Sequence, residues 1–258
     1  MLRFLTLLYG VICYLLFLAT FLYAIAFVGD VRIANIVPWT VDAGRAISPT
    51  TTALLINVAL LGLFGLQHSI MARPAFKAWI TKIIPRPIER ATYVLATCIC
   101  FVLLFWQWRA MPEVVWGVES QGVRAALWGL FALGWLLVLY STFLIDHFDL
   151  FGLRQVYLCL KGVEYTDPPF AQPWLYSMVR NPLMLGFVIG FWSIPTMTQG
   201  HLLFAVVASG YILVGIQFEE RDLLKALGED YRRYRASTPM LIPFLRFGPG
   251  QPSDPEQS

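Results

Sequence analysis

A group of charged and aromatic residues near the end of the chain is suited to binding a ligand that carries both a positive centre and a carboxylate. Carboxylate side chains bind cations, arginine binds carboxylates, and tyrosine rings bind cations over their faces. Nine residues in and around an uncharged stretch at 182–218 form this candidate binding set: Tyr176, Arg180, Asn181, Pro182, Gly186, Glu219, Glu220, Tyr231 and Tyr234. If the stretch folds back on itself, its two ends bring the set together.

Members of this set also have structural explanations when each is taken alone. Arg180 precedes Asn181 and Pro182, and a proline in the first helical turn leaves backbone N–H groups that favour an anion. The alternative for Arg180 is a side chain that extends to the lipid headgroups. For Glu219 and Glu220, the alternative is that water solvates them at the end of an apolar segment. For the two tyrosines, the alternative is that they belong to an aromatic belt at the membrane interface. The set as a whole is more informative than any member.

Histidines at the ends of apolar stretches are the candidates for proton transfer. His68 is the leading candidate for a general base, because histidine titrates near neutral pH. His147 and Asp149 form a second candidate catalytic set, since an aspartate can fix which ring nitrogen of a histidine carries the proton. Each histidine also has a structural alternative. His68 would form a hydrogen bond that holds helices together, and His147 would be solvated at a helix end. The four cysteines lack the CxxC or Cys/His spacing of a metal site, so we expect no metal.

Composition places these residues in a membrane protein. Hydrophobic residues make up 58% of the chain and charged residues only 14%, well below the quarter that is usual in soluble proteins. Four uncharged runs, each long enough to cross a hydrocarbon core with about 20 helical residues, lie at 4–29, 46–72, 91–108 and 125–145. The net charge of +3 is small, and nucleic acid is not an expected partner.

The uncharged stretch at 182–218 is too long for one crossing, since a straight helix of that length would measure about 55 Å at 1.5 Å per residue. Pro195 removes a helix hydrogen bond and Gly200 permits a tight reversal. We therefore expect a helical hairpin that turns at 196–201, with Gly186 and Gly190 spaced for close helix packing. The predicted fold is an all-α polytopic membrane bundle: four spans plus this hairpin, five to six transmembrane helices, and a cytoplasmic C-terminal helix.

The chain is expected to form a single membrane domain over residues 1–258, without room for a large aqueous domain. Its predicted parts are four spans within 1–145, a cytoplasmic connector at 146–181, the hairpin at 182–218, a cofactor-capping segment at 219–245 and a disordered tail at 246–258. Five basic residues between the second and third spans predict that this loop is cytoplasmic, because Lys and Arg are enriched on that side: Arg73, Lys77, Lys82, Arg86 and Arg90. Alternation then places both termini in the cytoplasm.

The spacing of the binding set resembles that of a known superfamily, the isoprenylcysteine carboxyl methyltransferases and phospholipid methyltransferases. The matching elements are Arg180-Asn181-Pro182 with Gly186, the pair Glu219-Glu220, and Gly228-x-x-Tyr231-x-x-Tyr234. The resemblance implies a membrane methyltransferase whose hairpin and C-terminal segment close over S-adenosylmethionine. The sulfonium cation, amino acid group and ribose of that cofactor are consistent with the carboxylates, arginine and tyrosines of the set.

A narrower resemblance is to the bacterial methanethiol S-methyltransferases. It is carried by Gln67-His68-Ser69 before a basic Arg-Pro-x-x-Lys, by the run from Asp146 to Gln155, and by Asn181 where the superfamily usually has His. It implies methylation of a small volatile thiol, methanethiol to dimethyl sulfide, at the cytoplasmic face of a bacterial inner membrane. Membrane lipid is the other expected partner, and no obligate protein partner is evident. A thiol pKa above 8 makes the reactive thiolate scarce at neutral pH, so a base such as His68 is expected.

Two other functions remain open from the sequence. A methyltransferase that acts on a lipid amine or an isoprenoid thiol would need a groove open sideways to the bilayer, which the sequence does not reveal. A membrane transporter or nonenzymatic partner protein would be expected to carry ionisable residues near the middle of its spans, or internal repeats. The sequence has neither feature.

Overall fold

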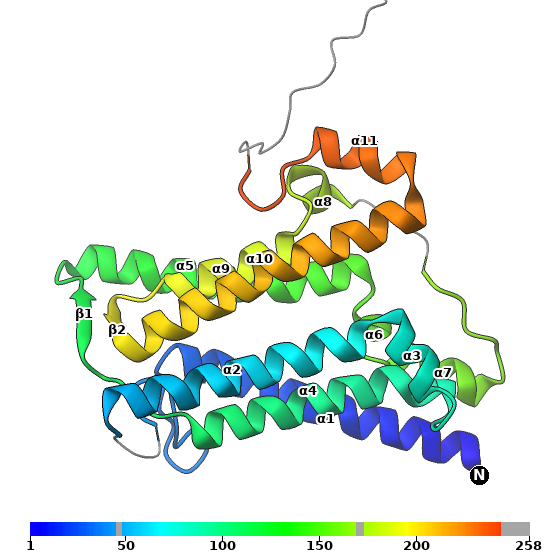
Figure 1. Ribbon diagram of the computed structural model, residues 1–258, viewed down its shortest axis with the longest axis horizontal. Coiled ribbons are helices and arrows are strands. Elements are labelled where there is room, and N and C mark those ends of the chain that lie inside the picture. Colours follow the sequence, from blue (N-terminus) through cyan, green and yellow to red (C-terminus); the bar gives the residue numbers. More distant parts are fainter. Residues whose placement is uncertain (45–47, 169–172, 244–258) are drawn as a thin grey trace, which may run out of the picture.

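Long apolar helices form the body of the protein, as a computed structural model of the chain shows for residues 1–44, 48–168 and 173–243. Five helices are long and apolar enough to cross a membrane: α1 (Leu2–Val28), α2 (Thr50–Ala72), α4 (Glu89–Gln107), α5 (Gln121–Ile145) and α10 (Gln199–Leu227). They lie roughly side by side, with α5, α9 and α10 above α1, α2 and α4 (Figure 1). The predicted polytopic helical membrane fold is confirmed, and the protein is an integral membrane protein.

The predicted hairpin is present, but its first arm is short. Helix α9 (Pro182–Trp192) has 11 residues, which at 1.5 Å per residue extend about 16 Å, roughly half of the hydrocarbon thickness. The chain reverses at strand β2 (Thr196–Thr198) and returns as α10. Because α10 continues to Leu227, Glu219 and Glu220 lie within a helix and not after its end.

A small sheet that the sequence did not indicate closes one end of the bundle. Strand β1 (Val114–Gly117) pairs antiparallel with β2, with Val114 opposite Thr198 and Gly117 opposite Thr196. This pairing ties the loop between α4 and α5 to the turn of the hairpin (Figure 1). Much of the aromatic core lies near this end, at the adjoining ends of α1, α4, α9 and α10: Phe27, Trp108, Phe191 and Phe204.

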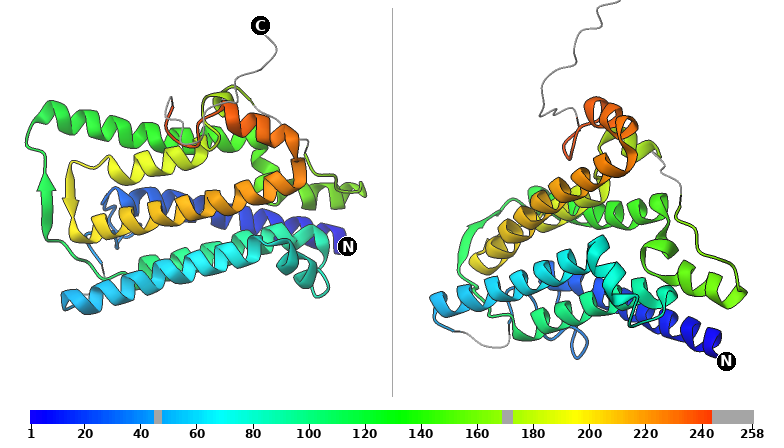
Figure 2. Two further views of the ribbon diagram at one scale, coloured as in Figure 1. Left: turned by 45° about the horizontal axis from the view of Figure 1, so that its top comes forward. Right: turned by 45° about the vertical axis from the view of Figure 1, so that its right-hand side comes forward.

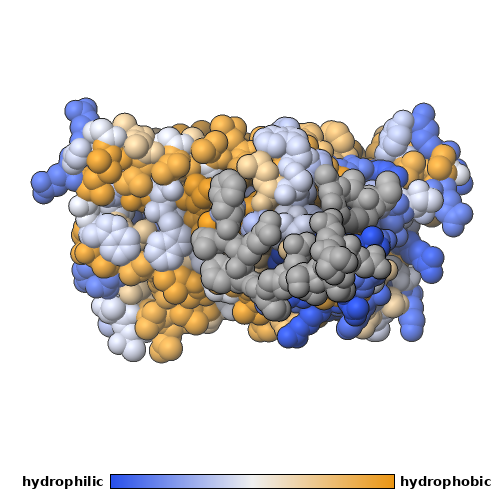
Figure 3. Space-filling model, turned by 90° about the horizontal axis from the view of Figure 1, so that it is seen from above, coloured by the Kyte–Doolittle hydropathy of each residue, from blue (hydrophilic) through white to orange (hydrophobic). Residues whose placement is uncertain are grey.

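Short helices lie toward the opposite end (Figure 2). They are α3 (Pro74–Ile80), η1 (Arg86–Ile88), α6 (His147–Leu150), α7 (Leu153–Lys161), α8 (Trp174–Met178) and α11 (Glu229–Ser237). Hydrophilic residues lie at both ends of the long axis and hydrophobic ones between them (Figure 3). Most of the predicted site residues therefore belong to one polar end. The predicted disordered tail at 246–258 and the start of the second run at residue 46 lie outside the described residues.

Glycines allow α5 and α9 to pack with their backbones in near contact. A Cβ atom added to Gly186 would lie 2.7 Å from the carbonyl oxygen of Gly134, and one added to Gly134 would lie 2.8 Å from that of Gly186. Gly190, one turn further along α9, faces the indole of Trp135. The spacing predicted close packing within the hairpin, but the partner is α5 and not α10. This packing explains Gly186, which the sequence also placed in the ligand-binding set.

Replacing Gly186 with alanine should destabilise the protein by about 1–3 kcal/mol, because the new methyl group meets backbone that cannot rotate away. Gly129→Ala on α5 is the matched control, since a Cβ atom there meets nothing within 4 Å. Thermal unfolding of both variants in detergent measures the difference. Equal midpoints for Gly186→Ala and the wild type would contradict the packing argument.

A half-buried carboxyl group at the β1–β2 end should make stability depend on pH. Asp42 accepts a hydrogen bond from the Thr198 hydroxyl. Its pKa is raised from 3.8 to about 6, mainly by burial and also by Asp30, while the Thr198 hydrogen bond and Arg32 oppose the rise. The folded state then binds more protons than the unfolded state between these values, so stability falls as pH rises from about 4 to about 6.

The variant Asp42→Asn should lose this part of the pH dependence. The measurement is the unfolding midpoint of both proteins at intervals from pH 4 to pH 7. A wild-type profile that parallels that of Asp42→Asn across the whole range would show that Asp42 does not contribute.

Candidate functional site

A buried ion pair connects the segment before α9 to α10 and α11. Nε and one terminal nitrogen of Arg180 lie 2.7 Å from the same carboxylate oxygen of Glu220, and the other oxygen lies 3.2 Å from Nε of Arg235. The side chains of Arg180 and Glu220 are only 9% and 4% exposed. Charges this far from water are tolerated when they are paired and hydrogen bonded. Glu220 thus neutralises two arginines from different parts of the chain.

The same segment also forms hydrogen bonds with the chain that follows α11. Arg180 donates side-chain hydrogen bonds to the carbonyl groups of Arg235 and Thr238, and its backbone N–H donates to Pro239 at 2.8 Å. Asn181 donates from its backbone and from its side chain to the carbonyl of Met240, both at 3.2 Å. Pro182 is the first residue of α9 and is buried. Arg180, Asn181 and Glu220 therefore act together as a clamp on the C-terminal segment.

The two tyrosines of α11 are buried beneath this clamp. Tyr231 and Tyr234 are 2% and 7% exposed, and their rings meet edge to face at 5.8 Å. The hydroxyl of Tyr234 donates to the carbonyl of Tyr176 at 2.6 Å. Burial raises the pKa of each ring hydroxyl to about 12; the charge of Glu220 adds to this and Arg180 opposes it. Both phenols are neutral throughout the physiological range.

Tyr176 and Glu219 have polar groups that the protein leaves available. The hydroxyl of Tyr176 is buried and has no hydrogen-bond partner among the described residues, an arrangement that costs free energy unless a ligand supplies the partner. Glu219 is exposed on α10. Burial raises the pKa of the Tyr176 hydroxyl, and the nearby charge of Glu219 raises it further. These two groups are the best placed of the predicted set to contact a ligand.

His68 lies in contact with Tyr93, which the sequence did not single out. The hydroxyl of Tyr93 is 2.9 Å from Nδ1 and 2.8 Å from Nε2 of His68. The ring of Tyr211, on α10, lies 6.4 Å from that of His68. Glu219 is eight residues further along the same helix, about 12 Å away. The structure therefore places His68 beside the helix that carries Glu219 and Glu220.

His147 and Asp149 are not brought together. His147 is buried, with Nδ1 at 2.8 Å from the Thr142 hydroxyl and Nε2 at 2.8 Å from the Tyr14 hydroxyl. Burial lowers the pKa of His147, and Asp146 opposes the shift. A neutral histidine with both nitrogens engaged connects α1 to α5, so its geometry is that of a structural hydrogen bond between helices.

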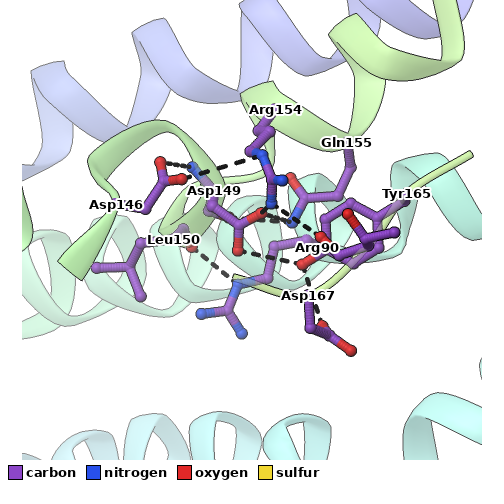
Figure 4. Close-up of polar contacts among 9 residues, drawn as sticks. Arg90, Asp146, Asp149, Leu150, Arg154, Gln155, Tyr165 and Asp167 are labelled. Atoms are coloured by element: carbon purple, nitrogen blue, oxygen red, sulfur yellow. Dashed lines mark hydrogen bonds and ion pairs between the residues drawn. The ribbon is translucent and has the colours of Figure 1, made fainter. Parts of the chain in front are cut away.

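Asp149 belongs to a separate polar network beside the start of α7 (Figure 4). It accepts from Arg154 at 3.0 Å and from the Tyr165 hydroxyl at 3.2 Å. Arg90 donates to the carbonyl of Leu150 at 2.8 Å. A cavity of about 790 Å³ borders the network and is lined on its basic side by Arg3, Lys77, Arg86 and Arg90. Among the predicted site residues, only Asp149 lines this cavity in the described structure.

Sequence reasoning missed Tyr93 because it lies within an uncharged helix, where an aromatic residue is usually core. The available signal was its position one turn after Arg90, at the polar end of the span. Over residues 1–44, 48–168 and 173–243, no three His, Cys, Asp or Glu side chains are grouped to hold a metal ion.

Removing the charge of Glu220 should destabilise the protein strongly. Glu220→Gln leaves the buried Arg180 without its counterion, a change that typically costs about 3–5 kcal/mol. Glu229→Gln is the control, because the Glu229–Arg232 pair is 3.5 Å apart and mostly exposed and such pairs contribute at most about 1 kcal/mol. Unfolding midpoints in detergent compare the two. Similar midpoints for both variants would mean that the Arg180–Glu220 pair does not hold the C-terminal segment.

Comparison with known proteins gives close relatives over almost the whole chain. The methanethiol S-methyltransferase of Mycobacterium tuberculosis is 56% identical over 242 residues, which cover 94% of this chain and 97% of the relative. A protein of the same name from Crocosphaera subtropica is 50% identical over 239 residues, covering 93% of this chain and 92% of that protein. Nurim from Rattus norvegicus is more distant, at 29% identity over 66% of this chain and 68% of its own length.

No family model and no solved structure matches the chain. The identity to the Mycobacterium tuberculosis and Crocosphaera subtropica proteins, together with coverage of nearly the full length on both sides, is far above what a shared membrane composition produces. This chain belongs to the methanethiol S-methyltransferase family.

Proposed function

We propose that the protein transfers a methyl group from S-adenosylmethionine to methanethiol, giving dimethyl sulfide, at the cytoplasmic face of a bacterial inner membrane. The names of its relatives support the acceptor. The observation that carries the assignment in this chain is that α10 bears both Glu219 and, about two turns earlier, Tyr211 beside His68.

The residues around Glu219 are consistent with S-adenosylmethionine as the donor. The unpartnered hydroxyl of Tyr176 would serve its amino acid group or ribose, and the exposed carboxylate of Glu219 would face its sulfonium. When bound, the cofactor supplies a methyl group activated by the positive charge on its sulfur. Tyr231 and Tyr234 would provide the aromatic wall, with the Arg180–Glu220 pair holding them in place and Asn181, Pro182 and Gly186 fixing the start of α9.

His68 is proposed as the group that takes the proton from the thiol. A thiol with a pKa above 8 is mostly protonated at neutral pH, and only the thiolate is a good nucleophile. The hydroxyl of Tyr93 can hydrogen bond with one nitrogen of His68 at a time, and the other nitrogen would take the proton. The half-buried site would also limit water, which helps to align the sulfur with the methyl carbon. His147 and Asp149 would act at a distance, through helix packing and through the network beside α7.

The polar end that carries α3, α6, α7, α8 and α11 is proposed to face the cytoplasm. The basic residues between α2 and α4 follow the rule that places Lys and Arg on that side: Arg73, Lys77, Lys82, Arg86 and Arg90. Both termini would then be cytoplasmic, and a soluble charged cofactor would reach Glu219 without crossing the membrane. Membrane lipid and the small thiol complete the proposed set of partners, and no obligate protein partner is needed for the site.

The direct test is an assay of the purified protein in detergent. Incubation with S-adenosylmethionine and methanethiol should release dimethyl sulfide into the headspace, measured by gas chromatography, and should form one S-adenosylhomocysteine for each product molecule. A lipid amine and an isoprenoid thiol, supplied in place of methanethiol, should give no product. Turnover of either of these with none of methanethiol would overturn the proposed acceptor.

The role of Glu219 has its own prediction. Glu219→Gln keeps the size of the side chain but removes the charge proposed to face the sulfonium, so the KM for S-adenosylmethionine should rise about tenfold, the cost of one charge-assisted contact. Asp222→Asn is the matched control on the same helix, because Asp222 forms an exposed pair with Arg73 at 2.9 Å. Equal KM values for the Glu219→Gln and Asp222→Asn variants would remove Glu219 from the donor site.

A further inference from the structure

Three aromatic side chains surround His68 on the side of the bundle where α2, α4 and α10 meet. The ring centroid of His68 lies 5.3 Å from that of Phe64, 5.1 Å from that of Tyr93 and 6.4 Å from that of Tyr211. We refer to these four residues as the aromatic cage. Helix α10 continues from this region toward the polar end, where it meets α11 (Figures 1 and 2).

Tyr93 is fixed from two directions. Its hydroxyl lies 2.9 Å from one nitrogen of His68 and 2.8 Å from the other, so it can hydrogen bond with only one of them at a time and the other remains to take a proton. The guanidinium of Arg90 lies over the Tyr93 ring, 5.2 Å from its centroid, and is itself held by the carbonyl of Leu150. A cation over the ring holds the tyrosine in place without occupying its hydroxyl.

Tyr211 is also held by two contacts, both with α2. Its hydroxyl lies 3.1 Å from that of Ser69, and its ring lies so close to Gly65 that a Cβ atom there would be 3.3 Å from it. Ser69 and Gly65 belong to α2, so Tyr211 joins α10 to α2 next to His68. A tyrosine held at both its ring and its hydroxyl cannot swing aside for a larger ligand.

We propose that the aromatic cage is the binding site of the acceptor thiol, in which Tyr93 positions His68 and Tyr211 limits the length of the alkyl group. The proposal rests on the proposed function and locates its acceptor. Apolar ring faces suit a small alkyl thiol, and His68 is the proton acceptor within the cage. Tyr211 of the cage and Glu219 of the proposed donor site lie on the same helix, eight residues and about 12 Å apart.

The bonds and the proton of the methyl transfer are all accounted for in this arrangement. The S–H proton of the thiol goes to a ring nitrogen of His68, and the thiol sulfur forms the new bond to the methyl carbon. The bond from that carbon to the sulfonium breaks, and its electron pair stays on the donor's sulfur. His68 then releases the proton to water at the polar end.

Shortening Tyr211 should widen the range of thiols. For wild type, Tyr211→Ala, Tyr211→Leu and Tyr211→Phe, kcat/KM is measured with methanethiol, ethanethiol and 1-propanethiol, and calorimetric binding of S-adenosylmethionine checks that each variant is folded. The ratio of 1-propanethiol to methanethiol should rise at least about tenfold in the alanine and leucine variants, since each methylene that fits an apolar pocket changes specificity by about that factor. Tyr211→Phe keeps the ring and should keep the wild-type ratio.

Tyr93→Phe tests the positioning role, because it removes the hydroxyl and keeps the ring under Arg90. Its kcat with ethanethiol should fall by about 100-fold, the usual size of a proton-transfer contribution, with the KM for the donor unchanged. With 2,2,2-trifluoroethanethiol, whose thiol is more acidic and therefore much more ionised before it binds than that of ethanethiol, the loss should be smaller. A purely structural defect would lower both rates equally.

The results of these experiments distinguish a wrong acceptor site from a wrong proposed function. An unchanged thiol ratio in folded Tyr211→Ala and Tyr211→Leu, with normal turnover of methanethiol, would overturn the cage alone. The same change of ratio in Tyr157→Ala, an exposed tyrosine on α7, would also overturn it. Wild-type protein that binds S-adenosylmethionine and methylates no thiol would overturn both proposals.

Discussion

The buried pair of Arg180 and Glu220 is the interaction on which the polar end of the molecule depends. Removing two charges from water is costly, and the pair is stable because Glu220 also reaches Arg235 while Arg180 donates to two carbonyl groups. These contacts bind α10 to the segment before α9 and to the chain after α11. The buried tyrosines of α11 owe their position to this closure.

The geometry of a helix explains why the adjacent residues Glu219 and Glu220 have different roles. Successive residues on an α-helix point about 100° apart, so when Glu220 is turned toward Arg180, Glu219 must face another direction. Glu219 is exposed. The structural pair thus determines where this exposed carboxylate stands, and Glu219 is the glutamate available for chemistry. The core near β1 and β2 keeps the other end closed.

The sequence predicted the features that follow from local composition. Spans appear as uncharged runs because the hydrocarbon excludes charge, and the predicted reversal at 196–201 falls on β2 and the start of α10. Proline and glycine marked that turn. The length of α9 was not predictable in the same way, because hydropathy does not show where within an apolar run a helix ends. Gly186 matched a ligand motif and a packing motif at once, and only the distance to Gly134 shows the packing.

Contacts between distant residues account for what the sequence did not reveal. Asp149 follows His147 by two positions, but Arg154 and Tyr165 engage its carboxylate while Thr142 and Tyr14 take up the histidine. Tyr93 and Tyr211 are separated from His68 by 25 and 143 residues, so no local pattern connects them. Their importance comes from the packing of α2, α4 and α10.

The position of the donor is the most direct test of the central claim. A structure of the protein with S-adenosylhomocysteine bound, determined in lipid nanodiscs by cryo-electron microscopy, should place the sulfur of the ligand beside Glu219, between Tyr176 and the His68–Tyr93 pair. Ligand bound instead in the cavity lined by Arg90, Asp149 and Tyr165 would contradict it.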